Sequence, residues 1–295
     1  MAIPVSGPVS ILDLATEFGG TAPHSMSEYY RGGGLVPNNN TGVPTSGVIS
    51  LSDFYGAVAG IVLDITSNTS NYNILTAATA AGYNAATDTT PIIVNVAAGV
   101  DITATSGNPG ITTGALNAAS DLTINIASTA SVCGFDGAQG ANGGTNTAGS
   151  AGGNGTDAIE FAVASGTGTY SVVNSGIVGG GSGGGGGAGG GGSAGARLTE
   201  YDDGKGSYYC FTPNVYGSAG IAGSAGVSGT SCRAQAGTNG TAGTNGGYPT
   251  NLCNISVVAG SGGAGGAGGT AGKAVDKGGL TVTTSGSGTY YGATS

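Results

Sequence analysis

The sequence from Gly180 to Gly195 reads GGSGGGGGAGGGGSAG, with glycine at 180, 183, 186, 189, 192 and 195 in one unbroken frame. This period of three residues fits neither an α-helix, which repeats every 3.6 residues, nor a strand, which repeats every two. The polyproline II conformation has three residues per turn, and glycine at every third position lets one edge of it pack against another backbone. A flexible Gly/Ser linker is the alternative for this composition.

The same frame recurs outside this stretch. Glycine occurs at 134, 137, 140, 143, 149, 152 and 155, at 217, 220, 223, 226 and 229, at 237, 240, 243 and 246, and at 260, 263, 266, 269 and 272. A linker has no reason to keep a frame, and collagen requires far more proline than the 9 residues of this chain. We therefore predict a bundle of short polyglycine II helices in residues 133–295, whose free backbone groups bond to neighbouring helices.

The charge balance excludes several classes of function. The chain has 295 residues, 6 Lys plus Arg against 15 Asp plus Glu, and a formal net charge of -9. No basic patch for nucleic acid can be assembled from so few cations. The N-terminus lacks the pattern of a secretory signal and no run is long and apolar enough to span a membrane, so we expect a product made in the cytoplasm without membrane insertion.

Four cysteines, Cys133, Cys210, Cys232 and Cys253, lie in or beside the glycine-rich part. Their spacing matches no zinc pattern. Structural thiols or one or two disulfides, formed after the protein leaves the cell, fit better than a metal site, and the pairing stays open.

Residues 1–57 form a separate module with an internal repeat at an offset of 40. A serine is followed three residues later by an acid in three places, which is the capping-box arrangement of a helix start. The three pairs are Ser10 with Asp13, Ser25 with Glu28, and Ser50 with Asp53. Three short helices bury little surface, so the module either attaches to a partner or packs on its own chain.

The region 58–132 is predicted to be β-rich. Residues 61–66, 91–96 and 121–126 are rich in β-branched side chains, and 72–86 could form a helix between the first two. Several of these strands are followed by a turn of small residues and then a second apolar residue. This weak repeat suggests either a stacked repeat structure or a small β-sandwich. The fold class expected is mostly β and irregular, with short capped helices first and the glycine bundle last.

Within the glycine bundle we expect large side chains only in the loops at the ends of the helices. The candidates for contact with a ligand are Tyr201, Asp202, Asp203, Tyr208, Tyr209, Phe211, Tyr216, Tyr248, Tyr290 and Tyr291. Tyrosine is a rigid, amphipathic contact residue, as paratopes show. The alternative is that these residues only cover the ends of a glycine core that has no side chains of its own.

Nothing in the sequence predicts an enzyme. His24 is the only histidine and precedes a predicted helix start, so no catalytic set that requires histidine can form elsewhere. Neither Asp202–Asp203 nor the pair Asp157 and Glu160 has a diagnostic spacing. We expect no cofactor and no metal.

The N-terminal string IPVSGPVSILDLATEFGG, with SMSEYYRGGG and GVPTSGVISLSDFYGA, resembles a module of tail-fibre and other virion proteins of tailed bacteriophages. The resemblance covers nearly all of residues 2–57. The following strands resemble phage tail proteins that pass into glycine-rich repeats. Residues 134–272 are similar in composition to fibre-tip adhesins built from polyglycine II helices with variable loops that bind host receptors.

This resemblance implies a virion protein of the tail or fibre that attaches the particle to its host. The module would bind other tail, fibre or baseplate proteins through Ser10, Asp13, Ser25, Glu28, Tyr29, Tyr30, Ser50, Asp53, Phe54 and Tyr55, and the loops would bind a host surface protein or polysaccharide. A purely structural component, such as a shaft, neck or capsid decoration, is the alternative, and an ice-binding protein is a third. A homotrimer suits fibres, but the glycine runs could equally pack within one chain.

Overall fold

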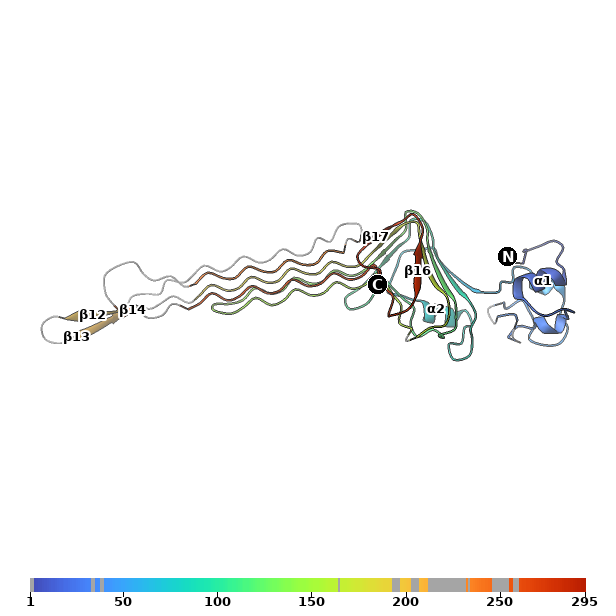
Figure 1. Cartoon of the computed structure of the whole chain (residues 1–295), viewed down its shortest axis with the longest axis horizontal. Coiled ribbons are helices and arrows are strands. Elements are labelled where there is room, and N and C mark those ends of the chain that lie inside the picture. The colour runs from blue at the N-terminus through green and yellow to red at the C-terminus, as the bar shows by residue number, and fades with distance from the viewer. Residues whose placement is uncertain are drawn as a thin grey trace.

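A computed structural model describes residues 3–32, 35–37, 40–163, 165–192, 197–202, 207–211, 232, 234–245, 255–256 and 260–295. The molecule is elongated, with the N-terminal module at one end, a β region next to it and a long glycine-rich part that leads to the other end (Figure 1). Among the described residues, no helix is long and apolar enough to cross a membrane.

The N-terminal module contains one α-helix and two 3-10 helices: α1 (Ile11–Phe18), η1 (Met26–Tyr29) and η2 (Leu51–Phe54). Each begins at one of the three predicted capping serines. The residue after each capping acid is completely buried, and these three residues are Leu14, Tyr29 and Phe54. The rings of Phe18 and Tyr29 both lie 6.3 Å from the ring of Phe54, so the module has a small core of its own.

The β region consists of three parallel sheets. The first contains β1 (Ile61–Ile65), β4 (Ile92–Val96), β7 (Leu122–Ile126), β10 (Tyr170–Asn174) and β16 (Val282–Ser285), in that order. The second contains β17 (Thr289–Tyr291), β11 (Ile177–Gly179), β8 (Ser131–Cys133), β5 (Asp101–Thr103) and β2 (Thr69–Ser70). The third contains β15 (Val275–Asp276), β9 (Ile159–Glu160), β6 (Ile111–Thr112) and β3 (Tyr72–Asn73).

The chain visits the three sheets in turn, so equivalent side chains stack above one another. In the first sheet Leu63, Val94, Ile124 and Val172 are in register and buried. Alternation of buried and outward residues along these strands places one face in a common core. Helix α2 (Ile74–Ala80) lies within the predicted range 72–86 and buries Ile74 and Ala78 in that core.

The sheets continue well beyond residue 132, the predicted end of the β-rich domain. Strands β9, β10, β11, β15, β16 and β17 all belong to the same three sheets as the earlier strands. The glycine-rich chain leaves the second sheet after β8 and again after β11, and returns to the third sheet at β9 and β15. The glycine-rich part is therefore inserted into the β region and does not follow it as a separate domain.

We define five glycine segments: segment I (residues 134–146), II (147–157), III (180–192), IV (234–245) and V (260–273). They run side by side away from the sheets and back (Figure 1). Backbone bonds pair segment III in parallel with I and IV and in antiparallel with II and V. Residues 178–192 are buried throughout, so segment III, which contains most of the stretch quoted first, lies at the centre.

The predicted three-residue period appears directly in the hydrogen bonds of segment III. The N–H groups of Gly181, Gly184, Gly187 and Gly190 donate to segment II, and those of Gly183, Gly186, Gly189 and Gly192 donate to segment IV. A Cβ added at Gly183, Gly186 or Gly189 would overlap a carbonyl oxygen of segment V. In the outer segment V only every third residue is buried, which explains why alanine and threonine occur between its glycines.

Candidate functional site

Three strands form a small antiparallel sheet at the end of the molecule farthest from helix α1 (Figure 1). We call it the tip sheet, and it consists of β12 (Arg197–Asp202), β13 (Ser207–Phe211) and β14 (Ile255–Ser256). β12 is the middle strand and pairs with both others. The bundle positions it, because β12 follows segment III and β14 precedes segment V in the chain.

Five of the predicted contact residues lie on the tip sheet. They are Tyr201 and Asp202 on β12, and Tyr208, Tyr209 and Phe211 on β13. These residues, predicted to lie in loops, are therefore on two antiparallel strands whose register pairs Tyr201 with Tyr208 and Glu200 with Tyr209.

The other predicted contact residues lie elsewhere. Asp203, Tyr216 and Tyr248 fall outside the described residues. Tyr290 and Tyr291 are in β17, paired with β11 at the opposite end of the bundle. Tyr290 packs against the core of the β region, and burial raises the pKa of its phenol. These two tyrosines are therefore not neighbours of the tip sheet.

Side chains on the outer segments complete the hydrogen bonds of the central one, which the sequence reading missed. Asp136 Oδ1 accepts from Ser182 N at 2.7 Å, and Asn142 Oδ1 accepts from Ala188 N at 3.0 Å. Both donors belong to residues only 1% exposed. The contacts of segments II and IV with segment V repeat this arrangement through Asn154, Asn239 and Asn245. The sequence does contain a signal for these bonds, because each of these Asn and Asp residues lies two positions after a glycine of the three-residue repeat.

The capping residues of the N-terminal module have structural contacts. The carboxylates of Asp13, Glu28 and Asp53 accept the backbone N–H of Ser10, Ser25 and Ser50 at 2.8, 3.2 and 2.8 Å. The hydroxyl and backbone N–H of Ser10 lower the pKa of Asp13.

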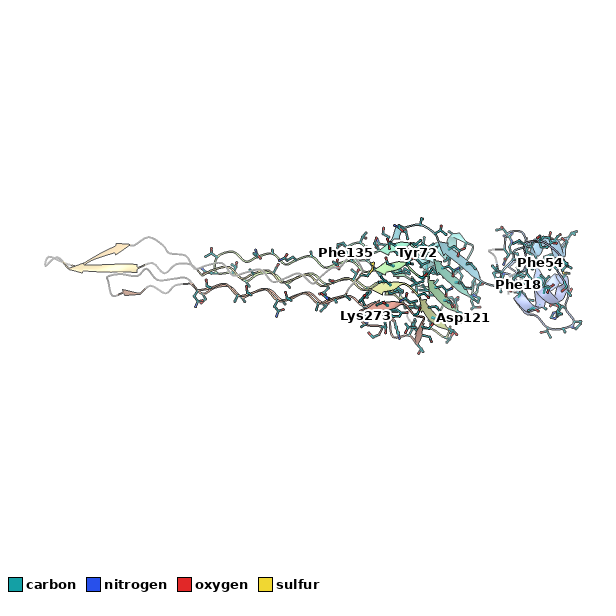
Figure 2. All side chains as sticks on the ribbon, turned by 90° about the horizontal axis from the view of Figure 1, so that it is seen from above. Phe18, Phe54, Tyr72, Asp121, Phe135 and Lys273 are labelled. Atoms are coloured by element: carbon teal, nitrogen blue, oxygen red, sulfur yellow. A yellow bond between two sulfur atoms is a disulfide. The ribbon has the colours of Figure 1, made fainter. Side chains whose placement is uncertain are left out.

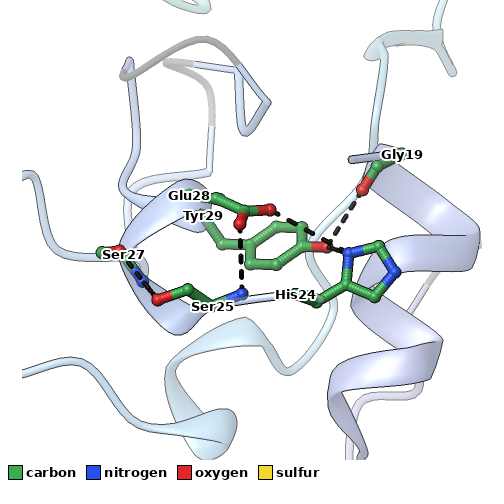
Figure 3. Close-up of polar contacts among 6 residues, drawn as sticks. All are labelled: Gly19, His24, Ser25, Ser27, Glu28 and Tyr29. Carbon is green, nitrogen blue, oxygen red and sulfur yellow. Dashed lines mark hydrogen bonds and ion pairs between the residues drawn. The ribbon is translucent and has the colours of Figure 1, made fainter. Parts of the chain in front are cut away.

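His24 also has a structural environment. Figure 3 shows its Nδ1, 3.3 Å from the Tyr29 hydroxyl and 3.9 Å from Glu28 Oε2. Tyr29 donates to Gly19 O at 3.0 Å, and burial together with Glu28 raises the pKa of this tyrosine.

Two of the residues predicted for virion attachment cannot form a contact surface in this structure. Tyr29 and Phe54 are 0% exposed because they fill the core of the module, where Figure 2 shows Phe54 near Phe18. Tyr30 and Tyr55 donate their hydroxyls to Gly47 O and Gly7 O, in the two turns that the sequence repeats.

The sequence reading missed the exposed apolar side chains of the module. They are Val5, Leu12 and Val48, and Val5 lies beside Gly56 in the fold.

One of the predicted disulfides is formed. Cys133, at the end of β8, is bonded to Cys232 across 99 residues of sequence. Cys210 lies on β13, register partner of Thr199, and Cys253 falls outside the described residues.

The acids considered for chemistry have separate structural partners. Asp157 Oδ1 accepts from Lys273 N at 2.5 Å, and Glu160 Oε2 accepts from Thr112 Oγ1 at 3.1 Å. Burial is the main reason why the pKa of Asp157 is raised. Within the described ranges, no group of three or more His, Cys, Asp or Glu side chains could hold a metal ion.

Comparison with known proteins gave two matches. A family described as "Phage tail fibre adhesin Gp38" matches residues 60–295. Among solved structures, the chain is similar to the "gp37-gp38 adhesin tip complex of the bacteriophage S16 long tail fiber", with 18% identity, 98% of this chain and 100% of that chain covered, and a TM-score of 0.34. No curated protein matches the sequence.

Proposed function

Because the chain belongs to the Gp38 family of phage tail fibre adhesins, we propose that the tip sheet is the surface that binds the host receptor. Its position carries this proposal: it lies at the far end of the molecule from the N-terminal module (Figure 1). Three tyrosines and a phenylalanine occur within residues 197–211, whereas segments III, IV and V contain no aromatic residue. Tyrosine supplies contact area at low entropic cost. The receptor would be a host surface protein or polysaccharide.

The glycine segments act as a rigid spacer in this proposal, as a bundle of polyglycine II helices. The three-residue period of their contacts supports it, as does the direction of their bonds, which join neighbouring segments. At about 3.1 Å per residue, segment III would extend for roughly 40 Å. The three parallel sheets would form a solenoid that holds the base of this spacer.

The N-terminal module is proposed to join the adhesin to another protein of the tail, fibre or baseplate, either as one copy or within a homotrimer. Val5, Leu12 and Val48 are 81%, 67% and 94% exposed, and they lie outside the core of the module. A partner surface would remove them from water, at a gain of about 25 cal/mol per Å² of apolar area.

Competition with phage adsorption tests the receptor site. Purified protein should block adsorption to host cells, and the variant Tyr201→Ala/Tyr208→Ala should lose that activity while it keeps its thermal unfolding profile. Ala264→Ser, an exposed change on segment V, is the matched control and should block adsorption normally. Undiminished blocking by the double variant would refute the assignment to the tip sheet.

Incorporation into particles tests the attachment surface separately. Val48→Asp should reduce the amount of the protein found in purified virions, because it places a charge where an apolar contact is proposed. Thr45→Asp adds the same charge at an exposed polar position of the same turn and should be incorporated normally. Equal incorporation of both variants would refute this surface.

A further inference from the structure

Four of the five glycine segments are continuous with strands of the three sheets. Segment I follows β8, segment II leads into β9, segment III follows β11, and segment V leads into β15. Segment IV differs, because no strand of the described structure adjoins its start at Ala234. Within the described residues, segment IV is therefore the one glycine segment that is not continuous with a strand of the three sheets.

The base of segment IV is instead joined to the β region by a covalent bond. Cys232, two residues before Ala234, forms the disulfide with Cys133 of β8. The Cys232 backbone lies against Gly179, the last residue of β11, where an added Cβ would overlap the Cys232 carbonyl oxygen. Cys133 and Gly179 are register partners on β8 and β11, so Cys232 lies beside both of these neighbouring strands at the base of the bundle.

Beyond the disulfide, segment IV is joined to its neighbours by hydrogen bonds along its length, including those accepted by the Asn239 and Asn245 side chains. Its carbonyls at Gln235, Thr238, Thr241 and Thr244 accept from segment III, and Gly237, Gly240 and Gly243 donate to segment V at 2.8 Å. It is more exposed than segment III, with no residue of 234–245 fully buried. At its outer end the chain continues toward β14, a strand of the tip sheet.

We propose that the Cys133–Cys232 disulfide anchors the base of segment IV to the β region and that reduction of this bond loosens segment IV and, through β14, the tip sheet. Reduction by a thiol or a phosphine delivers two electrons and breaks the S–S bond, leaving two thiolates that each take up one proton to become thiols. The thiol reductant is oxidised to a disulfide, or the phosphine to its oxide with an oxygen from water. The loop closed by the bond is long, and a cross-link restricts the unfolded chain more as the loop lengthens. The consequence for receptor binding rests on the proposed function, whereas the anchoring does not.

Hydrogen exchange measured by mass spectrometry tests the anchoring. In the folded wild-type protein, a phosphine reductant should accelerate exchange in segment IV by at least about tenfold, because local opening sets the exchange rate. Segment II is the internal control, since Gly149, Gly152 and Gly155 also donate to segment V but the segment leads directly into a strand. Equal protection of segment IV before and after confirmed reduction would overturn the proposal.

The variant Cys133→Ser/Cys232→Ser provides the second measurement. It should show the fast exchange of segment IV without reductant and should not respond to reductant, which separates this bond from effects of the other cysteines. If the variant does not fold, the reduced wild-type protein still decides the outcome. If reduction removed the exchange protection of segment IV but the protein still blocked phage adsorption, the anchoring proposal would stand. Only its link to the tip sheet would be refuted.

Discussion

Replacing Gly186 by alanine should break the centre of the bundle. An added Cβ would overlap Gly266 O, and both residues are buried. Gly266 O is the acceptor of Gly240 N at 2.8 Å, and Gly186 itself donates to Thr238 O at 2.9 Å. The new methyl group can be accommodated only if segment III separates from segment V, so we expect these bonds to be lost or distorted.

The expected cost follows from those two bonds. A buried donor or acceptor left without its partner costs about 1–3 kcal/mol, so two bonds cost roughly 2–6 kcal/mol. Two effects oppose this cost. The lower entropy of the unfolded chain with alanine stabilises the fold by about 0.4–1 kcal/mol, and burial of the added methyl carbon stabilises it by about 0.8 kcal/mol. The net destabilisation should therefore lie between about 0.2 and about 4.8 kcal/mol in the opening free energy of the bundle.

Hydrogen exchange of segments III, IV and V measures this opening free energy. The matched control is Gly144→Ala, because a Cβ there would meet only Thr147 Oγ1 at an ordinary distance of 3.5 Å. This control should be neutral or slightly stabilising. If Gly186→Ala and Gly144→Ala gave the same opening free energy, the steric argument for an all-small central segment would be wrong.

Three further changes test other parts of the structure. Asn142→Ala should cost about 1–3 kcal/mol of bundle stability, because it leaves the buried Ala188 N–H without its acceptor, while Asn142→Asp keeps that acceptor and should cost less in the same exchange measurement. Asp157→Asn should remove one contribution to the pH dependence of stability. Because burial raises the pKa of the Asp157 carboxyl in the folded protein, this carboxyl stabilises the wild type below its unfolded pKa, and that contribution is lost as the pH rises through the folded pKa. Thermal unfolding of both proteins from pH 3 to 8 should show this loss in the wild type and not in the variant. Phe54→Ala should cost about 3–5 kcal/mol in the N-terminal module alone, seen as faster exchange there with an unchanged bundle, and a global loss of protection would contradict the separate core.

The sequence predicted features that depend on local pattern. The three capping boxes, the strands near 61–66, 91–96 and 121–126 and the three-residue period all follow from neighbouring residues. The period alone did not reveal which segment is central. Segment III is surrounded by segments I, II, IV and V, so it needs small residues in every frame, and its near-continuous glycine is the mark of that position.

Long-range features were less accessible. The stacking of three sheets joins residues as distant as Tyr170 and Val282, and the weak repeat of the strands did not separate this arrangement from a sandwich. Burial of Tyr29 and Phe54 depends on how three short helices pack together, which capping patterns do not specify. The Cys133–Cys232 pairing likewise depends on the return of the chain to the base of the bundle.

The insertion of the glycine segments between strands of the β region separates two kinds of constraint on this chain. Residues of the three sheets must fit a shared core, and residues of segment III must be small, but the tip sheet contributes to neither, because the glycine segments separate it from the β region (Figure 1). Substitutions at the tip can therefore accumulate without a packing penalty in the rest of the molecule. Under the proposed function, the receptor-binding tip is therefore free to diverge while the bundle and sheets that present it stay the same.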